Sequence, residues 1–229
     1  MLTVFHPAKA PIRAVLFDMD GLLVDSERLA QQCCLDLCRD MGHPITMDTS
    51  RRMLGATHVE CVRILREAIP GFDEEAYFSR SKPLLWRLLE TSLAAKPGAH
   101  ALAGLLRQRQ MPYAIASSSS EERVRVSLDS TGLSALFPVR ITGDHGLPSK
   151  PAPDLFLAAA DLLGIAPQNC LVLEDSPKGV QAGRAAGCTV CMIPDLVPFS
   201  EALAPYCDML CDSLEDVPQL LAGFSDENK

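Results

Sequence analysis

Apolar and polar positions divide the chain into three parts with different periodicities. The first is a short apolar run, Val15–Phe17, which ends at Asp18-Met19-Asp20-Gly21. A continuous apolar run of this kind is typical of a buried parallel strand. Residues 26–94 instead repeat apolar side chains every three or four positions, which predicts a wholly helical block. After Pro97-Gly98, helical stretches alternate with short apolar runs, at 112–116, 139–141, 170–174, 189–193 and 209–210.

This alternation predicts an α/β fold, in which helices cover both faces of a Rossmann-like parallel sheet. Because the first strand belongs to the same sheet, the helical block interrupts the core. We therefore expect a core domain of residues 1–25 and 95–229 and an inserted, all-helical domain of residues 26–94. Within the insert, Ser26 is the expected N-cap of the first helix. Pro83 is expected to kink or split a long helical stretch over residues 73–95.

Polar residues follow the predicted strands where ligands bind in open α/β sheets, at the carboxyl ends. Each segment has an ordinary explanation when it is taken alone: an Asp-Gly turn, a helix cap, a solvated lysine or a helix start. Their shared position at one edge of the sheet favours a common site. The segments are Asp18 with Asp20, Ser117–Ser120, Lys150, and Glu174-Asp175-Ser176.

Charge and cysteine content narrow the possible partners and the compartment. The chain has 229 residues and a formal net charge of −8, which disfavours nucleic acid and anionic membranes as partners. We see no signal peptide and no apolar run long enough to span a membrane. Nine cysteines, an odd number, argue for free thiols packed in the core of a protein in a reducing compartment. We expect a cytoplasmic monomer, with a dimer as the alternative.

Four segments resemble, in order and spacing, the motifs of the haloacid dehalogenase-like (HAD) superfamily. They are Asp18-Met19-Asp20-Gly21 with Asp25, the apolar run that ends in Ser117, Lys150 in Ser149-Lys150-Pro151, and Glu174-Asp175-Ser176 followed by Gly179. The chain resembles the branch that includes β-phosphoglucomutase, phosphoglycolate phosphatase and many sugar-phosphate phosphatases. That branch carries a helical cap inserted soon after the first motif, where the helical block lies here. The resemblance covers nearly the whole chain and says little about the substrate.

The resemblance implies a nucleophile and a metal site. Asp18 would attack the phosphoryl group and form an aspartyl-phosphate. Mg²⁺ suits a hard oxygen site with few protein carboxylates. Its implied ligands are Asp18, Asp175 and the backbone carbonyl of Asp20, with Glu174 bound directly or through water.

The remaining motif residues would bind the phosphate and move protons. Asp20 would protonate the leaving oxygen and then activate water, for which we expect crowding by other carboxylates to raise its pKa. Lys150 would place a fixed positive charge beside the phosphate and Asp18. Ser117 and the backbone N–H of Ser118 would donate hydrogen bonds to phosphoryl oxygens.

The predicted cap favours a phosphatase over a mutase. In β-phosphoglucomutase-like mutases, one cap loop carries an arginine for a second phosphate and the first cap helix carries a catalytic histidine. By register, this chain has His58 and Ala30 at those positions. Arg51 and Arg52 are candidates to compensate, although exposed helical arginines explain them too. His58 is a candidate substrate contact, and a helix start with no special role is its alternative.

We therefore expect a Mg²⁺-dependent phosphatase that acts on a small phosphorylated metabolite, such as a sugar or nucleoside monophosphate. A phosphomutase of the β-phosphoglucomutase type and a non-catalytic phosphate-binding protein remain as alternatives.

Overall fold

A seven-stranded sheet organises the part of the chain that the structure describes. The structure is a computed structural model that describes residues 2–8, 10–54, 56 and 58–225. The strand order is β1-β7-β6-β5-β2-β3-β4, with β1 antiparallel to β7 and every other pair parallel. The strands are β1 Leu2–Val4, β2 Ala14–Phe17, β3 Tyr113–Ala116, β4 Arg140–Ile141, β5 Cys170–Glu174, β6 Thr189–Met192 and β7 Met209–Cys211. This arrangement confirms the predicted α/β class and adds β1, which was not predicted.

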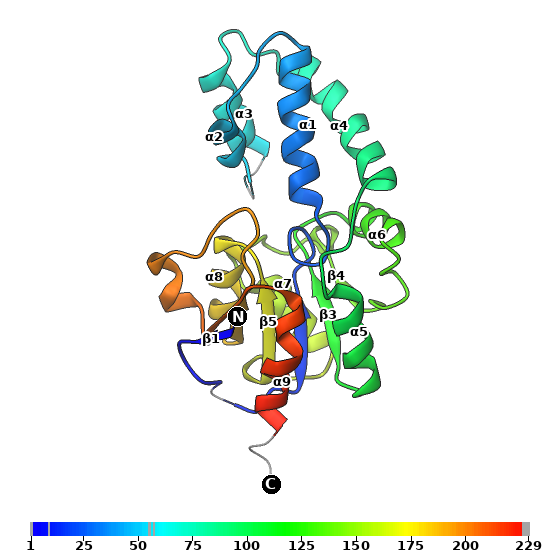
Figure 1. Cartoon of the computed structure of the whole chain (residues 1–229), viewed down its shortest axis with the longest axis vertical. Coiled ribbons are helices and arrows are strands. Elements are labelled where there is room, and N and C mark those ends of the chain that lie inside the picture. The colour runs from blue at the N-terminus through cyan, green and yellow to red at the C-terminus, as the bar shows by residue number, and fades with distance from the viewer. Residues whose placement is uncertain (1, 9, 55, 57, 226–229) are drawn as a thin grey trace.

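Helices cover both faces of the sheet, and a separate group of helices lies beyond its carboxyl edge (Figure 1). In the core, the helices are α5 Ala99–Gln108, α6 Glu121–Ser130, α7 Asp154–Leu162, α8 Pro177–Ala185 and α9 Val217–Ser225. Beyond the edge lie α1 Ser26–Asp40, α2 Met47–Arg51, α3 His58–Ala68 and α4 Glu74–Thr91. Short 3₁₀ turns occupy 143–145, 167–169, 201–206 and 214–216.

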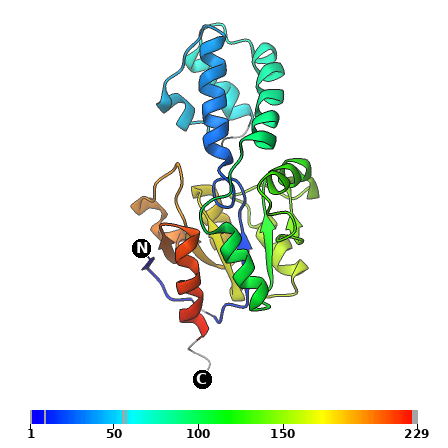
Figure 2. The same ribbon diagram turned by 45° about the vertical axis from the view of Figure 1, so that its right-hand side comes forward.

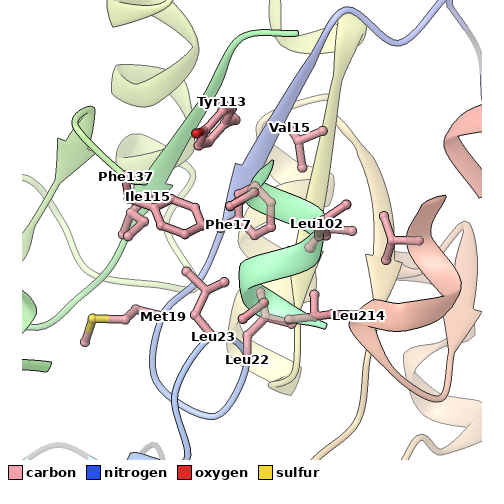
Figure 3. Close-up of a cluster of buried hydrophobic side chains, with 14 of the residues drawn as sticks. Val15, Phe17, Met19, Leu22, Leu23, Leu102, Tyr113, Ile115, Phe137 and Leu214 are labelled. Atoms are coloured by element: carbon pink, nitrogen blue, oxygen red, sulfur yellow. The ribbon is translucent and has the colours of Figure 1, made fainter. Parts of the chain in front are cut away.

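The alternation of side chains along β2 builds two separate cores. Val15 and Phe17 point into the layer formed with α5, α6 and α9, where they meet Leu102 (Figure 3). Ala14 and Leu16 point to the opposite face, into the layer formed with α7 and α8. Both faces of β2 are completely buried. This explains why the strand reads as a continuous apolar run in the sequence.

Three aromatic rings fix the end of β2 next to Asp18. Phe17 packs edge-on against Phe137 at 5.3 Å and against Tyr113 at 6.2 Å between ring centroids. Phe137 and Tyr113 complete the triangle at 5.4 Å. The Tyr113 hydroxyl donates a hydrogen bond to the Leu136 carbonyl at 2.5 Å, so the one polar atom in the triangle is satisfied.

Two adjacent linkers join the helical insert to the core (Figure 2). Val24 forms an antiparallel bridge with Ala95. The Asp25 backbone N–H donates to the Ala94 carbonyl at 3.0 Å, and the Lys96 N–H donates to the Leu23 carbonyl at 2.9 Å. The insert therefore leaves and re-enters the core at one point, above the strand ends.

Some local predictions for the insert are wrong. The N-cap of α1 is Asp25, and Ser26 is the first helical residue. The reason is that the Ser26 hydroxyl donates to the side chain of Asp20 and does not accept from the helix backbone. α4 is shorter than predicted and runs through Pro83 without being split. The short helix α2 was not predicted.

The cysteines lie in the core, as their number and the size of the protein predict. All nine cysteines are free thiols; eight are buried and Cys61 is half-buried. They therefore act as small core side chains. No helix in the described ranges is long and apolar enough to cross a membrane.

The aromatic triangle yields a prediction about stability. Phe137→Ala removes a fully buried ring and should lower the free energy of unfolding by about 3–5 kcal/mol. Leu162→Ala, at a side chain that is 59% exposed, should change it by less than about 0.5 kcal/mol. Chemical denaturation of both variants checks this, and equal losses would contradict the packing described here.

Candidate active site

The sheet brings the predicted site residues to one edge. Asp18 follows β2, Ser117 follows β3, and Glu174 ends β5. Because β2 lies between β3 and β5, Asp18 stands at the centre of this row. The strand order also reverses at β2, which is where open α/β sheets form a ligand-binding crevice.

Lys150 links two of these strand ends. Its ammonium group donates to Asp18 Oδ1 and, at 2.7 Å, to Glu174 Oε1. The Lys150 side chain is only 7% exposed and lies over the Phe156 ring, 4.7 Å from its centroid. Burial lowers the pKa of Lys150, but the two carboxylates outweigh burial and leave the pKa raised. Lys150 is thus a permanent positive charge at the sheet edge.

Both carboxylate oxygens of Glu174 accept hydrogen bonds. While Oε1 accepts from Lys150, Oε2 accepts from the backbone N–H groups of Asp175 and Ser176 and from the Ser176 hydroxyl, each at 3.0 Å. Gly179 makes room for this carboxylate, since a Cβ there would lie 1.7 Å from Oε1. Glu174 therefore anchors both Lys150 and the turn that carries Asp175.

The carboxylates of Asp18, Glu174 and Asp175 form a buried cluster, with oxygen atoms that lie within 4.8 Å of one another. Burial raises the pKa of Asp18 and Lys150 lowers it, but with the charges of Glu174 and Asp20 the net effect is a pKa of about 8. Burial and the neighbouring carboxylates also raise the pKa of Asp175 well above its usual range. One ammonium group cannot balance three carboxylates. A divalent cation would, and this set of hard oxygen donors fits one.

Asp20 has its own set of donors. Its Oδ1 accepts from Arg123 Nη2 at 2.8 Å and from the Ser26 hydroxyl, and its Oδ2 accepts from the Ser119 hydroxyl at 2.7 Å. Burial alone would raise its pKa, but Arg123 and these hydrogen bonds outweigh burial and lower it. The predicted raised pKa of Asp20 is therefore wrong, because the sequence did not place Arg123 beside it.

The serines after β3 take different positions. Ser117 is buried; its backbone N–H donates to the Ile141 carbonyl at 2.9 Å, and its hydroxyl accepts from the Ser119 N–H at 3.1 Å. Its hydroxyl hydrogen is thus left to donate to a ligand. Ser118 is exposed at the same strand end. Their roles toward phosphate stay predictions.

His58 contacts other residues of the insert. Its Nε2 lies 3.2 Å from Glu74 Oε1, and its ring centroid lies 4.5 Å from that of Phe78. It also lines a cavity of about 500 Å³ between α3 and α4. Residues 55 and 57 of the loop that leads to His58 lie outside the described residues. A substrate contact by His58 stays a prediction. Of the two candidate arginines, Arg51 is exposed and Arg52 pairs with Glu67 at 2.6 Å.

Sequence reasoning missed Glu27 and Arg123. Glu27 lies in the first turn of α1, where burial and the charges of Asp20, Asp195 and Glu174 raise its pKa to about 7. An acidic residue in a first helical turn is common, because it favours the helix dipole. That pattern gave no reason to place Glu27 near the site.

Glu27 should make the stability of the protein depend on pH. Folding raises its pKa from 4.5 to about 7, so between these values the folded protein keeps a proton that the unfolded chain has lost. This contribution to stability therefore falls as pH rises through that window. Glu27→Gln should raise the thermal midpoint relative to wild type more at pH 8 than at pH 4.5, measured with EDTA present. Glu90→Gln, at an exposed position on α4, is the control. The same gain at both pH values would contradict this.

Gly179 should be required for metal binding although it carries no side chain. A methyl group at this position overlaps the Glu174 carboxylate and must displace it. Gly179→Ala should weaken Mn²⁺ binding by about 10–100-fold, the usual cost of disturbing groups that support metal ligands. Gly104→Ala, where a Cβ meets nothing within 4 Å, is the matched control. Titration calorimetry measures both affinities, and unchanged binding by Gly179→Ala would argue against the cluster as the metal site.

The chain also resembles proteins of known family. A family model described as haloacid dehalogenase-like hydrolase matches residues 15–193. Hexitol phosphatase A of Escherichia coli is 33% identical over 90% of this chain and 93% of its own length. Protein SUPPRESSOR OF QUENCHING 1, chloroplastic, of Arabidopsis thaliana is 32% identical over 95% of this chain, which spans only 21% of that protein.

A solved structure agrees with this likeness. The HAD family hydrolase from Deinococcus radiodurans, with bound phosphate and sodium, superposes with a TM-score of 0.84 and 27% sequence identity. The alignment covers 95% of this chain and 98% of that one. The matched family model, the shared fold with its helical cap and the strand-end carboxylates therefore lead to one conclusion: the chain belongs to the haloacid dehalogenase-like hydrolases.

Proposed function

We propose that this hydrolase is a Mg²⁺-dependent phosphatase of small phosphorylated metabolites, such as sugar or nucleoside monophosphates. The observation that carries the proposal is the position of Asp18, which contacts Lys150 within a buried carboxylate cluster that could hold a divalent cation. Two likenesses support it: one to a hexitol phosphatase, and one to a hydrolase that holds phosphate.

Asp18 is the proposed nucleophile. Its Oδ1 is held by Lys150, which leaves the other carboxylate oxygen to attack phosphorus. Attack on a dianionic phosphate is unfavourable unless positive charge surrounds both partners. Lys150 supplies one such charge and keeps it through the reaction, because its pKa is raised. The product of this step is an aspartyl-phosphate on Asp18.

Asp18 and Asp175, with the backbone carbonyl of Asp20, would hold Mg²⁺, and Glu174 would support them directly or through water. When bound, the ion would neutralise phosphoryl oxygens and lower the pKa of Asp18, so that the nucleophile is ionised at neutral pH. The Ser117 hydroxyl would donate to a phosphoryl oxygen from the neighbouring strand end. To give a proton to the leaving oxygen, Asp20 would have to be protonated in the substrate complex, against the lowering of its pKa by Arg123; it would later accept a proton from the attacking water.

Residues 26–94 would act as a cap that decides which esters reach Asp18. The insert touches the core near the site, where Glu60 of α3 lies 3.6 Å from Lys178 of α8. Closure of such a cap would expel bulk water from the reacting groups. We place the enzyme in a reducing compartment such as the cytoplasm, as a monomer.

A phosphomutase is the second candidate, and the cap argues against it. A mutase must hold a second phosphate and keep water from the aspartyl-phosphate. Ala30 has no proton to move, and His58 pairs with Glu74 within the insert. A phosphatase needs neither feature. Conversion of one sugar-phosphate isomer to another with little released phosphate would favour the mutase.

The proposal is tested by release of phosphate from a panel of esters. The purified protein should release phosphate from hexitol, sugar or nucleoside monophosphates with Mg²⁺, and excess EDTA should abolish the release. Asp18→Asn should have no measurable turnover, because the amide is a poor nucleophile, while its thermal midpoint stays at or above that of wild type. Wild-type protein that releases phosphate from none of these esters would refute the proposal.

A further inference from the structure

Arg123 is a charged residue at the site that none of the four sequence motifs contains. It lies in the first turn of α6, directly after the serines that follow β3, and its backbone N–H donates to the N-cap Ser120 hydroxyl at 3.3 Å. This cap sets where the helix begins, and the start of the helix directs the guanidinium toward the end of β2. There, Arg123 Nη2 lies 2.8 Å from Asp20 Oδ1.

The contact is sheltered and connects two structural elements. The side chains of Arg123 and Asp20 are 27% and 20% exposed. Arg125, two residues further along the same helix, pairs with Asp129 one turn away and is 57% exposed. Arg125 therefore makes an ordinary surface pair, whereas Arg123 reaches across from α6 to the loop after the nucleophile.

The donors around Asp20 define how its carboxylate is turned. Arg123 and the Ser26 hydroxyl share Oδ1, and the Ser119 hydroxyl binds Oδ2. Arg123 is the charged member of this set. Its Nε is buried and has no hydrogen-bond partner among the residues that the structure describes, whereas its Nη2 binds Asp20. Arg123 is therefore one of three donors that set the orientation of the Asp20 carboxylate.

We propose that Arg123 is a positioning residue that orients the Asp20 carboxylate for proton exchange with the leaving oxygen. This inference rests on the proposed function, in which Asp20 is the acid and base. The competing explanation is that the pair only ties α6 to the loop and stabilises the fold. The two explanations differ in which substrates they affect.

An alkyl phosphate and an aryl phosphate differ in whether the leaving oxygen must be protonated by Asp20. When the P–O bond of an alkyl ester breaks, both electrons leave with the oxygen, and that alkoxide needs a proton, which Asp20 can deliver only if its carboxyl group has taken one up and faces the leaving oxygen. The 4-nitrophenolate released from p-nitrophenyl phosphate is stable without protonation. kcat/KM reports the steps up to transfer of the phosphoryl group to Asp18, so it isolates this first proton transfer. Loss of Arg123 should therefore impair the alkyl ester selectively.

The experiment compares Arg123→Gln, Arg123→Lys and the control Arg125→Gln with the full-length wild type and Mg²⁺. The alkyl ester is sorbitol 6-phosphate, or whichever alkyl ester the wild type hydrolyses best. Arg123→Gln should lower its kcat/KM by about 10²-fold, within the range of general acid–base catalysis, and that of p-nitrophenyl phosphate by less than about fivefold. Arg123→Lys keeps the charge and should recover part of the loss. Arg125→Gln should match wild type on both esters.

A double-mutant cycle gives a second readout. In an Asp20→Asn background, Arg123→Gln should cause no further loss on the alkyl ester, because the residue that it orients is gone. Equal losses on both esters, no loss on either, or a further loss in the Asp20→Asn background would overturn the positioning role and leave the phosphatase proposal intact. If Arg123→Gln fails to fold, the losses in kcat/KM on the alkyl ester and on p-nitrophenyl phosphate are compared for Arg123→Lys instead, with the same outcomes for and against the role. Wild-type protein that hydrolyses neither ester would overturn the proposed function and this role with it.

Discussion

The site depends on one imbalance, which is that three buried carboxylates share a single ammonium group. Lys150 contacts Asp18 and Glu174, and the hydrogen bonds of Glu174 are complete. Asp18 and Asp175 are left with raised pKa values and too little positive charge nearby. A carboxylate buried without compensation takes up a proton or binds a cation. The same cluster thus contains the proposed nucleophile and a place where a cation could bind.

The rest of the core holds these charges close together. Phe17 and its two aromatic neighbours fix β2, so Asp18 cannot move away from Lys150 without disturbing packed rings. Gly21 allows a close approach from the other side: its φ of +83° suits glycine, and a Cβ there would lie 2.2 Å from Asp175 Oδ2. Like charges repel and would separate in a looser structure. The favourable free energy of core packing therefore offsets the repulsion between these carboxylates.

The sequence predicted the site residues whose positions are set by the ends of the strands. It missed those whose positions depend on how far a side chain extends. Asp18, Ser117 and Asp175 could be placed together because strand ends in a parallel sheet meet at one edge. Arg123 could not, because nothing in the spacing of α6 shows how far a guanidinium extends. The error in the pKa of Asp20 followed directly from that omission. The prediction of Ser26 as a cap fails for a similar reason, because its hydroxyl binds Asp20, six residues earlier in the chain.

The partners of Asp20 also connect its orientation to the position of the cap. Ser26 is the first residue of α1, and Arg123 belongs to the core helix α6. Asp20 forms a β-bridge with Val24. Val24 forms a second bridge with Ala95, which lies in the returning linker. A rotation of the insert about these linkers would move the Ser26 hydroxyl, while Arg123 and Ser119 would stay with the sheet. Asp20 is thus held by one donor that follows the cap and two that do not, so movement of the cap would change the hydrogen bonding of this carboxylate without moving Asp18.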